Sequence, residues 1–334
     1  MNRVLQILGV LFSLSLPAFA QGNMSEVEQI GEANSAQASQ AAGVDTNNHS
    51  SLRQTGKGHQ STVDQGGFSA DNRSMIEQHG DSHTARVTQS FALIDNQSEV
   101  TQHGLGNLAE ISQAAEGGEN RSVVAQRGAS NEVRINQVGF LVDNASEVAQ
   151  DGTGNLTLIQ QGGVSVRNQS EIQVTGIENS TVVRQGGSFS ISESAVVLQG
   201  DWNAVMVNQD GPDGGTSKSA VSIVGNDNHA EVTQAGFVLN TSDLGVEGSS
   251  NRLTIDQAGS VDSNSSVIKL LGNDNTVQIA QGGIESSPLT TNQSEINISG
   301  NANTAHLVQG GEAAANTSLI EIVGDGNRAT VAQH

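Results

Sequence analysis

Polar and aliphatic residues alternate along this chain in short runs that recur at a nearly constant interval. Residues 96–102 carry asparagine, serine, valine and glutamine at every second position, and residues 107–113 carry asparagine, alanine, isoleucine and glutamine. A period of two is typical of a β-strand with one buried face. A Gly-Leu-Gly segment separates the two runs, and glycine accepts the positive φ that sharp turns require. The pattern predicts a strand, a sharp turn and a second strand.

This unit occurs thirteen times, mostly at intervals of 24 residues, and a fixed period of this length indicates stacked repeats. A glycine follows each repeat's first serine by six residues, and every second strand ends in glutamine. We therefore predict an all-β solenoid of about 13 stacked strand-turn-strand coils with parallel, in-register strands. The serines that set the register are Ser25, Ser50, Ser74, Ser98, Ser122, Ser146, Ser170, Ser194, Ser219, Ser242, Ser266, Ser294 and Ser318.

Stacking of identical residues predicts ladders of buried amides. Each glutamine or asparagine can then bond to the same residue in the next coil, which offsets the cost of removing it from water. One column is not uniform: four residues after the serine, the first six repeats carry glutamine and the last seven, from Val174 onward, carry an aliphatic residue. The carboxyl-terminal half is therefore expected to bury more apolar surface.

The first twenty residues differ from the rest. A short basic start is followed by an apolar run from Val4 to Leu16 and by Ala18-Phe19-Ala20, which is typical of a secretory signal peptide. We predict that residues 1–20 are removed and that residues 21–334 form a single repeat domain. No other apolar stretch is long enough to predict a membrane span.

Composition narrows the classes of partner. The chain has 35 acidic and 14 basic residues, a net charge of −21 and no cysteine. Such a balance argues against nucleic acid or an anionic membrane as a partner, and it helps to keep a strand-rich chain soluble. No disulfide framework supports the fold.

The repeat resembles that of the curlin family, the subunits of bacterial curli fibres. The matching residues of one copy are Asn96, Ser98, Val100, Gln102, Gly104, Asn107, Ala109, Ile111 and Gln113. The resemblance implies a protein exported to the surface of a Gram-negative bacterium, where a β-solenoid assembles end to end into amyloid fibres of the biofilm matrix and contributes to adhesion. It also implies the partners: further copies of the chain, a nucleator curlin and an outer-membrane secretion channel. The chain departs from the family in having more and longer repeats, and in lacking a glycine-rich segment before the first repeat.

If subunits join end to end, the repeat positions of the first and last coils must match across the junction. These candidate assembly residues are Ser25, Val27, Gln29, Gly31, Asn34, Gln40, Ser318, Ile320, Gly324, Asn327, Val331 and Gln333. The alternative is a monomeric β-solenoid adhesin or binding protein that does not polymerise.

Other chemistry finds little support in the repeat. Stacking would bring His59 next to His83 and His79 next to His103, which suggests metal binding, but imidazole could also replace an amide in a ladder or face solvent. Two Gly-Asn-Asp-Asn turns, at 225–228 and 272–275, resemble calcium loops but are explained by turn chemistry. Outward positions show no gathered carboxylates of the kind that glycoside-cleaving solenoids use. We predict no enzyme activity, no cofactor and no metal.

Overall fold

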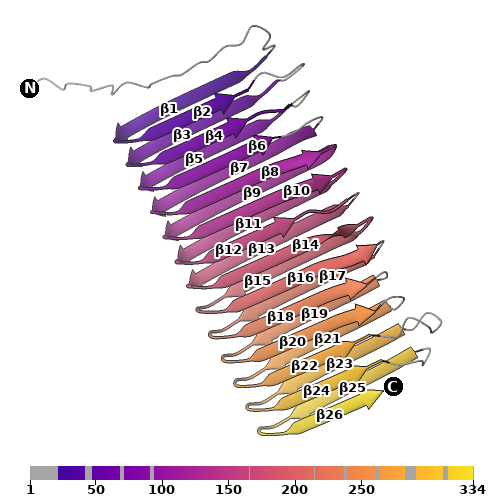
Figure 1. The fold of residues 1–334 in the computed structure, drawn as a ribbon. Helices are drawn as coiled ribbons and strands as arrows, with labels where there is room; N and C mark the ends of the chain where they lie inside the picture. Colours follow the sequence, from indigo (N-terminus) through magenta and orange to yellow (C-terminus); the bar gives the residue numbers. More distant parts are fainter. Residues whose placement is uncertain are drawn as a thin grey trace, which may run out of the picture.

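The computed structural model describes residues 22–41, 47–67, 71–90, 94–164, 166–213, 215–236, 239–259, 263–282, 291–310 and 315–333. The predicted signal peptide, residues 1–20, lies outside these ranges. The described residues form strands and the connections between them, with no helix. Figure 1 shows the strands stacked one above another along a single axis.

The strands belong to two sheets. The first sheet contains β1 (Met24–Glu32), β3 (His49–Lys57), β5 (Arg73–Asp81), β7 (Ile94–Leu105), β9 (Gly118–Ala129), β11 (Asp143–Thr153), β13 (Arg167–Ile177), β15 (Ile191–Gln199), β17 (Thr216–Val224), β19 (Leu239–Glu247), β21 (Ser263–Leu271), β23 (Thr291–Ser299) and β25 (Ala315–Val323). The second sheet contains β2 (Ser35–Gln40), β4 (Gln60–Gln65), β6 (Thr84–Ser90), β8 (Leu108–Glu116), β10 (Glu132–Phe140), β12 (Leu156–Gln161), β14 (Ser180–Ser188), β16 (Ala204–Asp213), β18 (His229–Gly236), β20 (Arg252–Gly259), β22 (Thr276–Gln281), β24 (Thr304–Gln309) and β26 (Arg328–Gln333).

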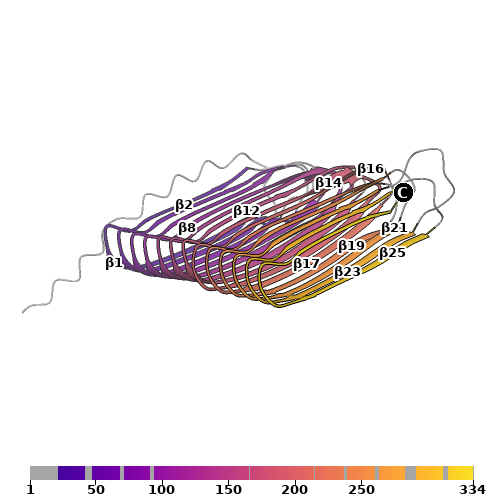
Figure 2. The same ribbon diagram turned by 90° about the horizontal axis from the view of Figure 1, so that it is seen from below.

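The chain winds alternately through the two sheets, which lie face to face in a flattened stack (Figure 2). We call one odd-numbered strand and the even-numbered strand after it a coil. Every strand pair is parallel, and strand order follows the sequence. Among the described residues each sheet has thirteen strands, and the outermost two have a single neighbour, so eleven coils lie between two others. The predicted all-β class and parallel solenoid stacking are confirmed.

The register places identical repeat positions above one another. Val100 pairs with Val124 and Gln102 pairs with Gln126, and the same columns continue through the neighbouring strands. Each sheet turns one face to the other, so every second side chain is buried, and both of these valines are at most 1% exposed. The period of two in the sequence thus reflects a core one side chain deep on each sheet.

One core column changes in the middle of the stack. In the first six coils, each glutamine donates from Nε2 to Oε1 of the next, as Gln102 does to Gln126 at 2.8 Å. Coil 7 has the buried Val174 at this position, and Gln150 donates instead to the hydroxyl of Thr157 at 2.9 Å. From coil 7 onward, buried valine, leucine and isoleucine side chains fill the column.

The change from glutamine to aliphatic residues leaves one buried hydroxyl without a hydrogen-bond partner. Thr181 stacks on Thr157, is fully buried, and its hydroxyl bonds to nothing in the described part of the chain. Thr181→Val is expected to raise the free energy of unfolding by about 1–2 kcal/mol, because it removes a buried, unpaired polar group of the same shape. Thr157→Val is the matched control: it should lower the free energy of unfolding by about 1 kcal/mol, because Gln150 loses the shortest of its three hydrogen bonds. Urea denaturation measures the change in the free energy of unfolding for both variants. If it changes in the same direction in both, the two hydroxyls do not differ in hydrogen bonding as described.

Candidate assembly surfaces at the two ends of the stack

The predicted assembly residues of the first coil lie where the repeat places them. Ser25, Val27, Gln29 and Gly31 stand in register with the equivalent residues of coil 2, and Gln40 stands in register with Gln65. Equivalent side chains of interior coils are fully buried, but Val27 and Gln29 are only partly buried, because no described residue covers the outer edge of β1.

The last coil is likewise partly open to solvent, at the other end of the stack. Ser318 and Ile320 are buried on β25, whereas Val331 and Gln333 on β26 are partly exposed and Asn327 is exposed in the turn. β25 pairs with β23, β26 pairs with β24, and neither has a second partner among the described residues. The structure therefore separates the candidate residues into two surfaces at opposite ends of the stack (Figure 1).

The glutamine ladders give the two ends different hydrogen-bonding character. Gln40 donates from Nε2 to Gln65 at 3.0 Å, and the column continues in the same direction to Gln309 and Gln333 at 2.9 Å. In the described part of the chain, Gln40 Oε1 accepts no hydrogen bond, and Gln333 Nε2 donates only to the carbonyl of Thr317. The first coil thus offers an acceptor and the last coil a donor in the same column.

The turn glycines allow the coils to approach closely. A Cβ added to Gly31 would lie 1.8 Å from the carbonyl oxygen of Gly56, and one added to Gly300 would lie 2.1 Å from that of Gly324. At Gly324 itself φ is +106°, and the nearest atom to an added Cβ is Asn327 Nδ2 at 3.5 Å. Each interior turn glycine is needed because a Cβ would collide with the carbonyl of the following coil. At Gly324, the corresponding space is not filled by any described residue.

The asparagine after the turn binds the backbone of the next coil. Asn34 Oδ1 accepts the backbone N–H of His59 at 3.1 Å, and Asn303 Oδ1 accepts that of Asn327 at 2.8 Å. Asn34 Nδ2 donates to the carbonyl of Gly56 at 3.1 Å. The side chain thus satisfies turn groups that a strand ladder does not reach.

His59 and His83 take the place of this asparagine in coils 2 and 3. Both are fully buried, and their rings stack with centroids 5.1 Å apart. Each Nδ1 accepts a backbone N–H of the next coil, from His83 at 3.3 Å and from Asn107 at 3.1 Å. Each Nε2 therefore carries the proton and donates to a carbonyl, that of Thr55 or of His79. With every ring nitrogen engaged, the pair acts as part of the ladder.

His79 and His103 also stack, with centroids 4.9 Å apart, on the outer face of the first sheet. His79 Nε2 donates to Glu77 Oε1 at 2.9 Å, and this hydrogen bond lowers the pKa of Glu77. The predicted proximity of both histidine pairs is confirmed. Within the described ranges, however, no three histidine or acidic side chains gather as a metal site would require.

The buried pair predicts a local response to acid. Burial lowers the pKa of His83 below its ordinary value of 6.5, so the folded state binds the proton less readily than the unfolded state. The neutral ring therefore contributes its full share to the free energy of unfolding above about pH 6.5. That contribution decreases as the pH falls below this value. His59 and His103, on the two adjacent coils, lower the pKa of His83 further. On its own coil, the hydrogen bond to the carbonyl of His79 and the charge of Asp81 raise this pKa but offset only part of the lowering.

We expect strands β3 to β6 to lose protection against hydrogen exchange between pH 7.5 and pH 5, before the other strands do. A His59→Asn/His83→Asn variant restores the repeat's own residue, so its protection should not depend on pH in this region. Hydrogen exchange resolved by coil measures both proteins, and equal loss in the variant would show that the histidines are not the cause.

No model of a protein family matches the chain, and no curated protein matches it. Among the described residues, no helix has the length and apolar character needed to cross a membrane. The resemblance to curlins therefore rests on the repeat positions and serves below as the basis of a proposal.

Proposed function

We propose that this chain is a secreted structural protein, a curlin-like subunit of thirteen coils that assembles end to end into extracellular amyloid fibres. The observation that supports this best is the unbroken register of both sheets up to their outermost strands. An open parallel edge presents a row of backbone N–H and C=O groups that another strand can pair with. Coil 1 of one subunit placed on coil 13 of another extends both sheets without a change of register.

The junction also extends several side-chain columns. Gln333 Nε2 of one subunit would face Gln40 Oε1 of the next, in the direction that every interior rung uses. Val27 would cover Ile320 in the core. On the outer face Ile30 and Val323, which are 55% and 75% exposed, would cover one another and bury apolar surface.

The rest of the proposed function follows from the resemblance. The fibre belongs to the cell surface and biofilm matrix of a Gram-negative bacterium and contributes to adhesion, with a nucleator curlin and an outer-membrane secretion channel as further partners. The role is structural, and the chain performs no catalysis. Export depends on the predicted signal peptide, residues 1–20.

The alternative is a monomeric β-solenoid adhesin. One observation favours it: Glu26, Glu28 and Glu32 line the outward positions of β1 and are exposed. Charged side chains on an edge strand are a common protection against unwanted pairing, and solenoids that stay monomeric carry polar caps.

Assembly of the purified mature chain separates the two proposals. Electron microscopy and thioflavin fluorescence over time should show unbranched fibres and a rising signal, with strands about 4.8 Å apart along the fibre axis. Particles that remain monomeric at every concentration would favour the adhesin.

A further inference from the structure

The two ends of the stack would match in most ladder columns, but in three columns their junction would differ from the interior of the stack. If coil 13 of one subunit preceded coil 1 of the next, Glu28 would lie beside Glu321 and Glu32 beside Asp325, because these residues follow the first serine by three and seven positions in both coils. Adjacent strands lie about 4.8 Å apart. The proposed self-junction therefore places two pairs of carboxylates next to each other.

Within the chain, the same two columns avoid this arrangement. Glu28 pairs with Arg53 at 2.8 Å and Glu32 with Lys57 at 3.2 Å, and the third coil returns to acids. In neither column do two acids occupy adjacent coils. Each exposed pair contributes little by itself, but like charges directly opposite one another are destabilising.

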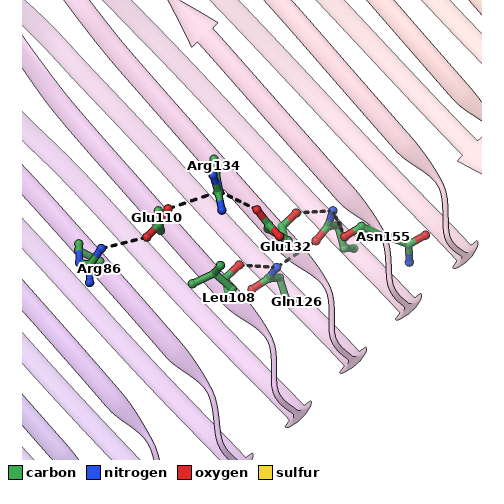
Figure 3. Close-up of polar contacts among 8 residues, drawn as sticks. Arg86, Leu108, Glu110, Gln126, Glu132, Arg134 and Asn155 are labelled. Atoms are coloured by element: carbon green, nitrogen blue, oxygen red, sulfur yellow. Dashed lines mark hydrogen bonds and ion pairs between the residues drawn. The ribbon is translucent and has the colours of Figure 1, made fainter.

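Opposite charges in adjacent coils also occur on the second sheet. Figure 3 shows Arg86 and Arg134 on either side of Glu110. The Glu110 carboxylate lies 3.0 Å from Arg86 Nη1 and 3.4 Å from Arg134 Nε. Six of the eight ion pairs among the described residues join one coil to the next. In the Glu28 and Glu32 columns, no two acids therefore face each other inside the stack, unlike at a junction of its own two ends; Glu147 and Glu171 do face each other in a different column.

The third difference lies in the core. Gln29 donates from Nε2 to Gln54 at 2.7 Å, so its Oε1 faces the preceding coil. Inside the stack this oxygen finds donors: Gln78 Oε1 accepts from Gln54 Nε2 at 3.0 Å and from the hydroxyl of Ser61 at 2.9 Å. Coil 13 offers Ile322 and Ala329 at these two positions, and neither side chain has a donor. A carbonyl oxygen buried without a donor weakens the junction.

We propose that the first coil is the docking surface for a second solenoid subunit of different sequence, and that this subunit binds it better than another copy of this chain does. The last coil of that partner carries glutamine in the Gln29 column and basic side chains in the Glu28 and Glu32 columns. Coil 2 already presents this chemistry to coil 1 from the other side, with Gln54, Arg53 and Lys57. The proposal rests on the end-to-end assembly proposed above.

A variant of this chain can supply the complementary end. Glu321→Lys/Asp325→Asn leaves coil 1 unchanged, and both new residues occur in the same columns elsewhere, as Lys269 and Asn301. Asparagine also keeps the turn bond, since Asn301 Oδ1 accepts the N–H of Asn273 much as Asp325 Oδ1 accepts that of Asn301. Self-association of the variant then reports how coil 1 binds a complementary coil.

Sedimentation equilibrium of wild type and variant should show head-to-tail association about five- to tenfold tighter in the variant. Added salt should strengthen association of the wild type and weaken that of the variant, because it screens repulsion in one and attraction in the other. Adding Ile322→Gln should tighten association further, and thermal melting shows whether that variant is folded. Glu147→Lys/Asp151→Asn, on exposed positions of β11, changes the net charge equally and should leave association unchanged.

The partner proposal is overturned if the charge variant associates no better than wild type, if neither associates, or if the β11 control gains as much. Electron microscopy of the wild type judges the fibre separately. If wild-type fibres form but the charge variant associates no more tightly than wild type, end-to-end assembly is supported and the second subunit is not.

Discussion

Gly324→Ala is expected to slow fibre growth strongly at the last coil while leaving the isolated chain folded. A Cβ at the equivalent Gly300 would lie 2.1 Å from the carbonyl oxygen of the next coil, a separation that only a backbone shift can relieve. At Gly324 the carbonyl of the next subunit's Gly31 would occupy that place. Overpacking of this kind costs roughly 1–3 kcal/mol, so elongation should slow by roughly 10- to 100-fold.

Gly326→Ala is the matched control two residues away. Its φ is +69° and nothing lies within 4 Å of an added Cβ. Other coils carry Ser82, Trp202 or Asp227 at this position with φ between 56° and 59°, so alanine fits the turn. Elongation from wild-type seeds, followed by thioflavin fluorescence, compares the two variants with wild type.

Thermal melting of the monomers measures the backbone strain of alanine at the positive φ of Gly324 separately from the clash at the junction. This strain is confined to the final turn and should change the melting temperature slightly. Equal growth of Gly324→Ala and wild type would show that subunits do not add coil on coil at this end.

Sequence alone predicts the architecture of this chain because the repeat is strict. The alternation around Val100 and Gln102 indicates strands, and the glycine between the two runs indicates the turn. The constant interval then indicates which residues stack, so the proximity of His59 to His83 follows without any structural information. Few folds permit such inference, since register is normally set by contacts between distant parts of the chain.

The atoms that meet within each column could not be predicted in the same way. The glutamine columns donate toward the carboxyl end, as from Gln40 to Gln65, whereas one asparagine column donates in the opposite direction, as from Asn72 to Asn48. These directions depend on rotamers and on which carbonyls lie within reach. The unpaired hydroxyl of Thr181 depends on the same information, and so does the mismatch of Gln29 at the junction.

The largest difference expected within the chain is between its two halves. The first six coils carry a hydrogen-bonded glutamine column ending at Gln150, and the last seven carry a buried aliphatic column beginning at Val174. A buried aliphatic side chain contributes roughly 1.5–3 kcal/mol of transfer free energy, whereas a paired amide contributes about 1 kcal/mol net. Over several coils the difference should reach several kcal/mol, even after allowance for a compact unfolded state.

Coils of a solenoid interact mainly with their neighbours, so folding begins where they are most stable and spreads from there. We therefore expect the carboxyl-terminal half to fold first and to template the amino-terminal half. Two fragments of six coils each, residues 21–163 and residues 168–310, make a comparison of equal length. The second should fold faster and unfold at higher denaturant concentration in stopped-flow and equilibrium measurements. If the first fragment is equally stable, the aliphatic column does not set the order of folding, and the amide ladder contributes as much as the apolar residues that replace it.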